Sequence, residues 1–259
     1  MKILFIGDIV GEPGRRVIMK RLHKIISQYQ VDLVIGNAEN AAGGFGITPD
    51  VAGDLFDMGL SVITLGNHAW DKKEAISLIE RDERLLRPAN YPEGVPGRGA
   101  MTVETAKGET LGILQVMGRV FMPTLDCPFR VAEREVAMLR EHTPAIIVDM
   151  HAETTSEKTA MGHFLDGKVS AVVGTHTHVQ TADDQMLPRG TAYLTDIGMT
   201  GPVNSVIGMK PDTVIQKFLT QMPRRFEVAS GPAVLQAALI EVDGLTGKAI
   251  GIQRIQVPE

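Results

Sequence analysis

The chain has 259 residues, a net charge of -5 and a single cysteine. This length allows one large α/β domain or two small ones, with a substantial core. The acidic balance argues against a general nucleic-acid-binding protein, which usually carries a basic excess. One cysteine, Cys127, cannot form an internal disulfide, and no apolar run fits a signal peptide or a membrane span. We therefore expect a cytoplasmic protein with no membrane partner.

Short apolar runs alternate with helical patterns in the first part of the chain. The runs at residues 3–6, 31–35 and 62–65 predict strands that are buried on both faces. Between them, residues 15–28 and 49–58 carry apolar side chains at helical spacing. Strands that alternate with helices predict βαβ units and parallel strand pairing.

The rest of the chain is richer in strands. Residues 101–106 and 111–116 predict a hairpin, and residues 131–141 predict a charged helix. Further strands are predicted at residues 145–148, 169–173, 192–195, 225–229, 234–242 and 249–257. Because α/β units are followed by antiparallel strands, we expect a mixed pair of sheets covered by helices. With no repeat and no clear linker, residues 1–259 are expected to form a single domain.

Polar side chains follow five of the predicted strands, at the point where each strand ends. They are Asp8, Glu39, Asn40, Asn67, His68, His151, His176 and His178. Ligands of open α/β sheets bind at the carboxyl ends of the strands, so these side chains are expected to meet at one rim. Any one of the first six, taken alone, could instead be a helix cap, a turn or a satisfied polar residue.

The pair His176 and His178 is a stronger signal for a metal site. Two histidines at i and i+2 of an extended segment point to the same side and can reach neighbouring metals. Imidazole, carboxylate and amide oxygen together suit Mn, Fe or Zn better than Ca, and the lack of thiolates argues against a structural zinc. The set exceeds what one metal needs, so a two-metal site is predicted, with Glu39 as its bridge.

The remaining histidines carry no such signal. His23 lies in the first predicted helix and His142 near the end of the charged helix, and both are expected to be solvated. His163 follows Gly162 in a segment predicted to be a loop.

The ordered motifs resemble those of the calcineurin-like metallophosphoesterases, and more closely those of the bacterial YmdB-like subfamily. The matching segments are residues 7–11, 37–42, 66–73, 87–90, 151–153, 174–178 and 195–202. The resemblance implies an α/β fold, a four-layer αββα sandwich with two mixed β-sheets and a metal site at the C-terminal ends of the strands. It also implies a phosphodiesterase that acts on 2′,3′-cyclic nucleotides.

The resemblance further implies a role for each site residue. One metal would be held by Asp8, Glu39, Asn40 and His178, and the other by Glu39, Asn67, His151 and His176. A hydroxide bridging the metals would attack phosphorus, and His68 would assist the leaving group from outside the metal shell. Two metal ions per chain are expected, Fe or Mn first, with Zn or Mg as alternatives. The resemblance identifies no substrate-binding residue.

Two positions depart from the pattern of the wider superfamily. Val10 stands where the superfamily usually has a histidine, and Asn40 is the candidate to replace that ligand. Glu39 stands in place of the usual bridging aspartate. Both departures match the YmdB-like subfamily. They leave the identity of the metal open, because oxygen in place of nitrogen makes a site harder.

Three other functions remain open at this stage. The same metal site could serve a phosphomonoesterase or 5′-nucleotidase. A metal-dependent regulator that senses a nucleotide without hydrolysing it is another class. A nuclease is disfavoured because only 5% of residues are aromatic, although RNA ends that carry a cyclic phosphate remain possible substrates. We also expect a homo-oligomer, because helix and sheet edges could pair.

Overall fold

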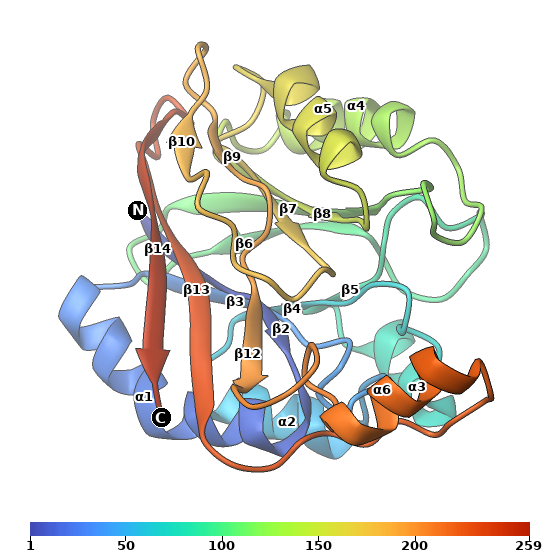
Figure 1. Ribbon diagram of the computed structural model, residues 1–259. Coiled ribbons are helices and arrows are strands. Elements are labelled where there is room, and N and C mark those ends of the chain that lie inside the picture. Colours follow the sequence, from blue (N-terminus) through green and yellow to red (C-terminus); the bar gives the residue numbers. More distant parts are fainter.

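Two mixed β-sheets lie face to face in the computed structural model, which describes the whole chain, Met1–Glu259 (Figure 1). The first sheet contains β1 (Lys2–Ile6), β2 (Asp8–Ile9), β3 (Leu33–Asn37), β4 (Val62–Thr64), β5 (Leu85–Leu86), β12 (Met199–Pro202), β13 (Ala233–Val242) and β14 (Ala249–Pro258). The second contains β6 (Ala100–Glu104), β7 (Thr110–Met117), β8 (Ile146–His151), β9 (Ala171–Thr175), β10 (Gln185–Met186) and β11 (Ala192–Leu194).

Each sheet has a parallel centre and antiparallel additions. In the first sheet β1, β3, β4 and β5 are parallel neighbours, as the alternation of strands and helices predicts. Strand β13 runs antiparallel to β1, β12 and β14. In the second sheet β7, β8, β9 and β11 are parallel, while β6 and β10 pair antiparallel at the edges. The carboxyl ends of the parallel strands therefore meet on one side of the molecule.

Helices cover the outer face of each sheet and complete four layers. The covering helices are α1 (Gly11–Tyr29), α2 (Pro49–Asp57), α3 (Lys73–Arg81), α4 (Pro128–Leu139) and α5 (Thr155–Leu165), and a sixth helix, α6 (Pro211–Thr220), lies outside these layers. Helices α1, α2 and α3 share a core of 25 buried residues with the first sheet. The inner faces of the two sheets share a core of 18, and α4 and α5 share one of 16 with the second sheet. These three cores confirm the predicted αββα sandwich.

Local sequence signals explain where the early helices lie. Helix α1 buries Val17, Ile18 and Leu22 at helical spacing, so one apolar stripe faces the sheet. Helix α2 begins where the hydroxyl of Thr48 accepts a hydrogen bond from the Val51 amide at 3.4 Å. Pro49 occupies its first turn, where no amide hydrogen is needed. These signals place α1 and α2 before the parallel strands β3 and β4, respectively.

The structure corrects two local predictions. Residues 225–229 do not form a strand, because their only β-bridge is an isolated one between Val228 and Met209 and no continuous strand pairing follows. His163 lies within α5 rather than in a loop, and its side chain is exposed. His23 and His142 are exposed, as expected for solvated histidines.

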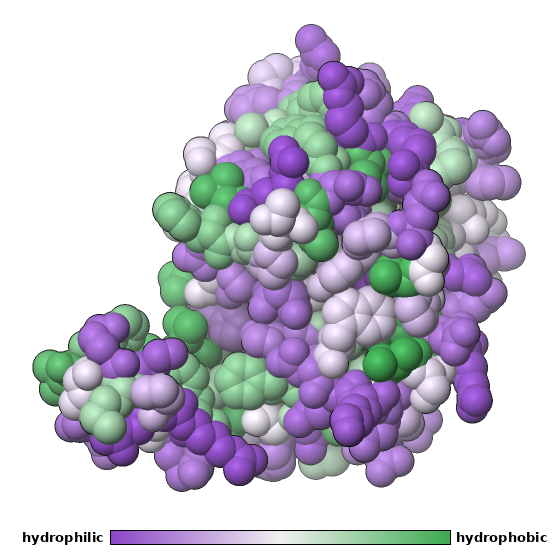
Figure 2. All heavy atoms as spheres, turned by 90° about the vertical axis from the view of Figure 1, so that its right-hand side faces the viewer, coloured by the Kyte–Doolittle hydropathy of each residue, from purple (hydrophilic) through white to green (hydrophobic).

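Helix α6 stands apart from the four layers. Only Val214 of its residues is buried. Seen from the right-hand side of Figure 1, the corresponding part of the molecule projects from the body at lower left and carries apolar atoms on its surface (Figure 2). No helix of the chain combines the length and apolar character needed to cross a membrane.

Candidate metal centre

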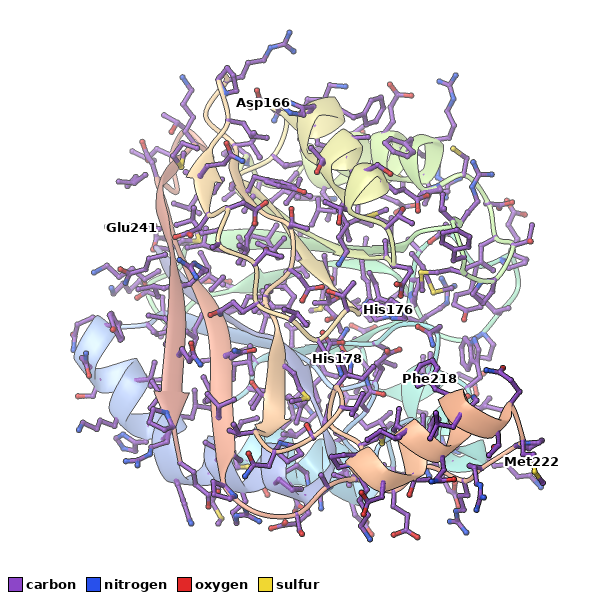
Figure 3. The ribbon with its side chains drawn as sticks, in the orientation of Figure 1. Asp166, His176, His178, Phe218, Met222 and Glu241 are labelled. Atoms are coloured by element: carbon purple, nitrogen blue, oxygen red, sulfur yellow. The ribbon has the colours of Figure 1, made fainter.

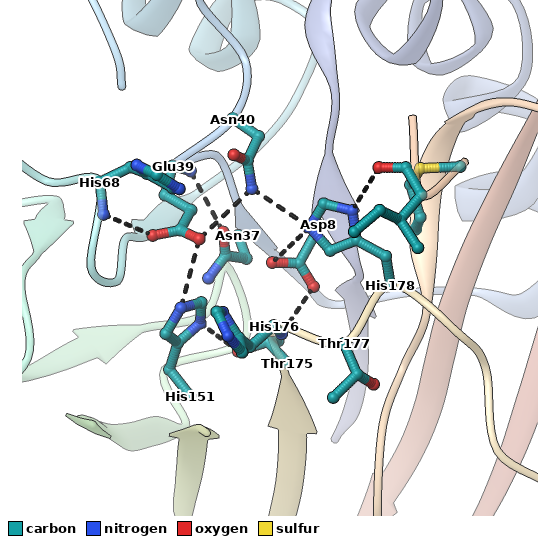
Figure 4. Close-up of polar contacts among 12 residues, drawn as sticks. Asp8, Asn37, Glu39, Asn40, His68, His151, Thr175, His176, Thr177 and His178 are labelled. Atoms are coloured by element: carbon teal, nitrogen blue, oxygen red, sulfur yellow. Dashed lines mark hydrogen bonds and ion pairs between the residues drawn. The ribbon is translucent and has the colours of Figure 1, made fainter. Parts of the chain in front are cut away.

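The structure brings the eight predicted site residues together where the two sheets meet: Figure 4 labels all of them except Asn67, which contacts His151. The first sheet contributes Asp8 from β2 and the segments that follow β3 and β4. The second contributes His151, the last residue of β8, and the histidines that follow β9. The site therefore exists only when the two sheets are stacked, and its members come from strands far apart in the sequence.

Glu39 lies at the centre of this group and is almost completely buried. Its Oε1 is 3.2 Å from Nε2 of His151, and its Oε2 accepts a hydrogen bond from the His68 amide at 2.9 Å. Burial raises the pKa of this carboxyl, but His151 and His68 outweigh burial and hold the pKa at about 2. Glu39 is therefore an anion at neutral pH, with each oxygen turned toward a different part of the site.

Hydrogen bonds fix the imidazole of His151. Its Nδ1 is 2.9 Å from the hydroxyl of Thr175, which itself donates to Asp149 at 2.7 Å. The hydroxyl must therefore accept from Nδ1, and Nε2 faces Glu39 and the Asn67 amide oxygen, 3.0 Å away. Burial lowers the pKa of His151, but Glu39 more than offsets this effect and raises it to about 9.

His176 completes a first group of residues that could hold a metal ion. Its ring packs edge to face on that of His151 with centroids 4.8 Å apart, and its Nε2 is 3.1 Å from Glu153. Burial and the neighbouring His151 lower its pKa to about 3, so the ring is neutral and keeps a lone pair for a metal. Donor atoms of Glu39, His151 and His176 all lie within 4.8 Å of one another.

Asp8, Asn40 and His178 form a second group beside the first. Asp8 is fully buried, and its Oδ1 has no hydrogen-bond partner. Nε2 of His178 is 3.8 Å from this oxygen and 3.3 Å from the Asn40 side-chain nitrogen. Burial raises the pKa of Asp8 to about 6, against the opposing effect of His178.

An unpartnered buried carboxylate oxygen is costly, and a cation would satisfy it. A half-turn of the Asn40 amide would place its oxygen where the nitrogen now lies, giving a third donor. The residues of this second group therefore fit a divalent metal ion.

The backbone around the last two histidines is strained and firmly held. His176, His178 and Ile207 have φ angles of 99°, 63° and 45°, in a region that side chains other than glycine rarely adopt. Nδ1 of His178 lies 2.9 Å from the carbonyl of Ile207. Such strain persists where surrounding contacts over-determine the backbone, and it is common at functional sites.

A buried ion pair also holds the loop that carries His176 and His178. Asp196 accepts hydrogen bonds from the amide and hydroxyl of Thr177, at 3.1 and 2.7 Å. Nζ of Lys158 is 2.6 Å from the same carboxylate oxygen, and both side chains are buried. Thr177 thereby fixes the turn between the two histidines.

The imidazole of His68 faces the cavity beside the metal-binding groups. Its Nδ1 is 2.7 Å from Asp71, and the Phe45 ring packs against it with centroids 5.1 Å apart. These contacts orient the ring through Nδ1, and His68 lines a cavity of about 410 Å³. Glu39, His176 and His178 line the same cavity.

Several residues that position the site escaped the sequence analysis. They are Asp71, Asp149, Lys158, Thr175, Asp196 and Ile207. Asp71 had a usable signal, since a carboxylate three residues after His68 in a tight turn can reach its ring. The others act from separate strands and helices, so no local pattern reveals them.

A four-layer sandwich with imidazoles and carboxylates at its strand ends is the architecture of calcineurin-like metallophosphoesterases. Within that class, the chain belongs to the YmdB-like protein family, whose model matches residues 4–255. The resemblance found in the motifs is thereby confirmed, and a protein of the metallophosphoesterase type implies the use of a divalent metal.

Named relatives cover the whole chain. A Bacillus subtilis (strain 168) protein named 2′,3′-cyclic-nucleotide 2′-phosphodiesterase is 48% identical, over 99% of this chain and 97% of its own. A solved structure of a hypothetical protein from Thermus thermophilus is 45% identical, with a TM-score of 0.93 and complete coverage of both chains. A structure described as a novel phosphatase from Mycoplasma pneumoniae is 37% identical, with a TM-score of 0.93, and covers 100% of this chain and 94% of that one.

Proposed function

We propose that the chain is a phosphodiesterase that hydrolyses 2′,3′-cyclic nucleotides at a site for two divalent metal ions. The broader class, a hydrolase of phosphoric esters, is that of its named relatives. The observation that carries the proposal is the pairing of two groups of donor atoms around Glu39, one of them with an unpartnered buried carboxylate. Because the groups come from both sheets, we treat residues 1–259 as one functional domain.

The ligands divide between the two metals by proximity. Asp8, Asn40 and His178 would hold one cation, and Asn67, His151 and His176 the other. Glu39 would serve both, since its Oε1 lies 3.2 Å from Nε2 of His151 in one group and 3.3 Å from the side-chain nitrogen of Asn40 in the other. Fe and Mn suit this mixed nitrogen and oxygen set, with Zn or Mg as alternatives. When bound, such cations supply Lewis acidity toward a phosphoryl group and lower the pKa of water.

His68 is proposed as the catalytic proton donor. Its pairing with Asp71 at 2.7 Å orients the ring and favours a proton on Nδ1, while Nε2 faces the cavity. In the protonated imidazole Nε2 also carries a hydrogen, which it can give to the leaving ribose oxygen. Asn67, the residue before His68, can stabilise the negative charge that develops on the phosphoryl oxygens.

The test is a substrate panel with metal control. Protein treated with EDTA and then supplied with Mn²⁺ is assayed on 2′,3′-cyclic AMP, 3′,5′-cyclic AMP, bis-p-nitrophenyl phosphate and p-nitrophenyl phosphate. We expect metal-dependent turnover of the diesters, fastest for the 2′,3′-cyclic substrate. Turnover of the monoester alone would instead establish a phosphatase. Binding of nucleotide without turnover under any metal would establish a regulator.

The role of His68 is tested in the same assay. His68→Ala should lower kcat by about 10²–10⁴-fold while the bound metal stays unchanged, because the ring assists proton transfer from outside the metal shell. His163→Ala is the control, since this exposed imidazole lies on α5 and not in the cavity. Unchanged turnover in His68→Ala would remove the assigned role.

A further inference from the structure

The cavity at the metal centre has two chemically different halves. One half carries the imidazoles and carboxylates described above. The other half is apolar, and its wall comes from Phe45 and from the segment 206–226, which includes α6. The side chains that line this apolar half include Phe45, Ile207, Val214, Phe218 and Phe226. The total volume, about 410 Å³, falls in the range of small-molecule sites.

An exposed aromatic ring stands at the open edge of the apolar half. Phe218 of α6 is 71% exposed and lines the cavity. It lies on the side of α6 nearest His176 and His178, whereas Met222 lies at the far end of the projecting segment (Figure 3). Packing of the fold does not account for this ring, because α6 buries only Val214.

The segment that carries Phe218 is tied to the metal centre. The carbonyl of Ile207 is held 2.9 Å from Nδ1 of His178, at the strained backbone described above. Lys217, the one charged side chain that this segment adds to the cavity, lies 4.8 Å from the centroid of the Phe226 ring. The apolar wall therefore keeps a fixed relation to the imidazoles, with no carboxylate or amide of its own.

We propose that the apolar half is the subsite for the nucleobase of the substrate, with Phe218 as its stacking surface. This inference rests on the proposed function. A base has two weakly hydrated faces, and stacking on an aromatic ring is tolerant of base identity. Apart from the Lys217 ammonium, which lies over the Phe226 ring, the side chains of this wall offer no hydrogen-bonding group that could read the edge of a base. The enzyme should therefore require a base for efficient turnover and discriminate little among the four bases.

The test compares two cyclic phosphodiesters that differ in the base. Glycerol 1,2-cyclic phosphate carries the same five-membered ring as 2′,3′-cyclic AMP but no base. Phe218→Ala should lower kcat/KM for 2′,3′-cyclic AMP by about 5–150-fold, mainly through KM, and leave glycerol 1,2-cyclic phosphate unchanged. Phe218→Tyr, which keeps the aromatic face, should retain most of the wild-type value.

Leu219→Ala is the matched control. Leu219 is the next residue of α6, is 72% exposed and does not line the cavity. Leu219→Ala should leave kcat/KM for both substrates unchanged. A loss in Leu219→Ala equal to that in Phe218→Ala would instead indicate that the apolar face of α6 docks a second protein chain.

The outcomes separate this inference from the proposed function. Equal wild-type kcat/KM on the two cyclic diesters would keep the phosphodiesterase and overturn the base subsite. The subsite is also overturned if Phe218→Ala affects both substrates alike, affects neither, or is matched by Phe218→Tyr. Wild-type protein that hydrolyses neither cyclic diester would overturn the proposed function and the subsite with it.

Discussion

Single residues decide whether the two groups of donor atoms can approach one another, and Gly66 is the clearest case. A side chain at this position would collide with Nε2 of His151 and Oε2 of Glu39. The backbone passes so close to both groups that only glycine leaves room for them. Gly66 thus shapes the site without offering any ligand atom.

Gly66→Ala should therefore weaken metal binding while the protein still folds. We expect bound metal per chain, measured by elemental analysis after dialysis, to reflect a loss of affinity of at least 10–100-fold. Gly53→Ala is the control, because a methyl group there meets nothing within 4 Å and alanine favours the helix. Full metal content in Gly66→Ala would show that Glu39 and His151 can move apart without penalty.

At the scale of elements, the ion pair between Lys158 and Asp196 joins α5 to the segment after β11, and Asp196 in turn binds Thr177 in the loop after β9. Both side chains are buried, so each neutralises the charge of the other. Asp196 also accepts a hydrogen bond from Thr177 and so holds that loop in place. Loss of one partner leaves the other as an uncompensated buried charge. That situation is much worse than loss of an exposed pair.

Lys158→Met should consequently destabilise the protein by about 3–5 kcal/mol. Urea unfolding followed by circular dichroism measures the change, with Lys24→Met on exposed α1 surface as the control. Combining Lys158→Met with Asp196→Asn should recover part of the loss, since no net charge then remains buried. A cost below about 1 kcal/mol for Lys158→Met would contradict the argument.

A second contact between elements should make the stability of the protein depend on pH. Glu259 receives Arg16 at 2.7 Å and Lys20 at 2.5 Å, and so links the chain after β14 to α1. These two cations lower the pKa of Glu259 from 4.5 to about 2. The folded protein binds this proton more weakly than the unfolded chain does. The contribution to stability is therefore complete above pH 4.5 and is lost as pH falls toward 2.

Glu259→Gln should thus melt below the wild type at pH 7, because it cannot form the charged contacts. The difference in Tm should narrow as pH falls from about 4.5 toward 2, between the pKa of this carboxyl in the unfolded chain and its pKa in the folded protein. Differential scanning calorimetry at several pH values measures both quantities. A constant difference in Tm across this range would rule out the charge as its cause.

Sequence patterns predict elements whose signals are local, and miss those that depend on distant partners. The apolar runs of β1, β3 and β4 predict buried strands, and the polar residues just past them predict a metal site. The charge pair of Lys158 and Asp196 spans 38 residues and has no local signal. Helix α6 also escapes prediction, because its apolar residues serve a projecting surface and a cavity rather than a core stripe.

At the scale of the whole molecule, metal binding should add to stability, because the donor atoms come from both sheets. A ligand at one hundred times its Kd stabilises the folded state by about 2.7 kcal/mol. For a chain of this size that corresponds to a rise in Tm of roughly 5–10 °C. EDTA-treated protein should therefore melt lower than protein with Mn²⁺, as measured by calorimetry.

Asp8→Asn provides the control for this shift. The amide fills the same space but lacks the charge that a cation would neutralise, so its Tm should respond much less to Mn²⁺. If wild type and Asp8→Asn gained the same increase, the stabilising metal would lie elsewhere on the protein.

The assembly of the site from both sheets has a consequence for biosynthesis. On the proposed ligand set, Asp8 leaves the ribosome 170 residues before His178, a delay of roughly 10–30 s. Until the later imidazoles emerge, the nascent chain offers mainly carboxylate and amide oxygens and lacks most of the nitrogen ligands of the proposed site, which favour Fe over Mg or Ca. The amide of Asp8 is also held by Gly198, which emerges later still. We therefore expect the finished chain to acquire its metals after release, from whichever ions the cell then supplies.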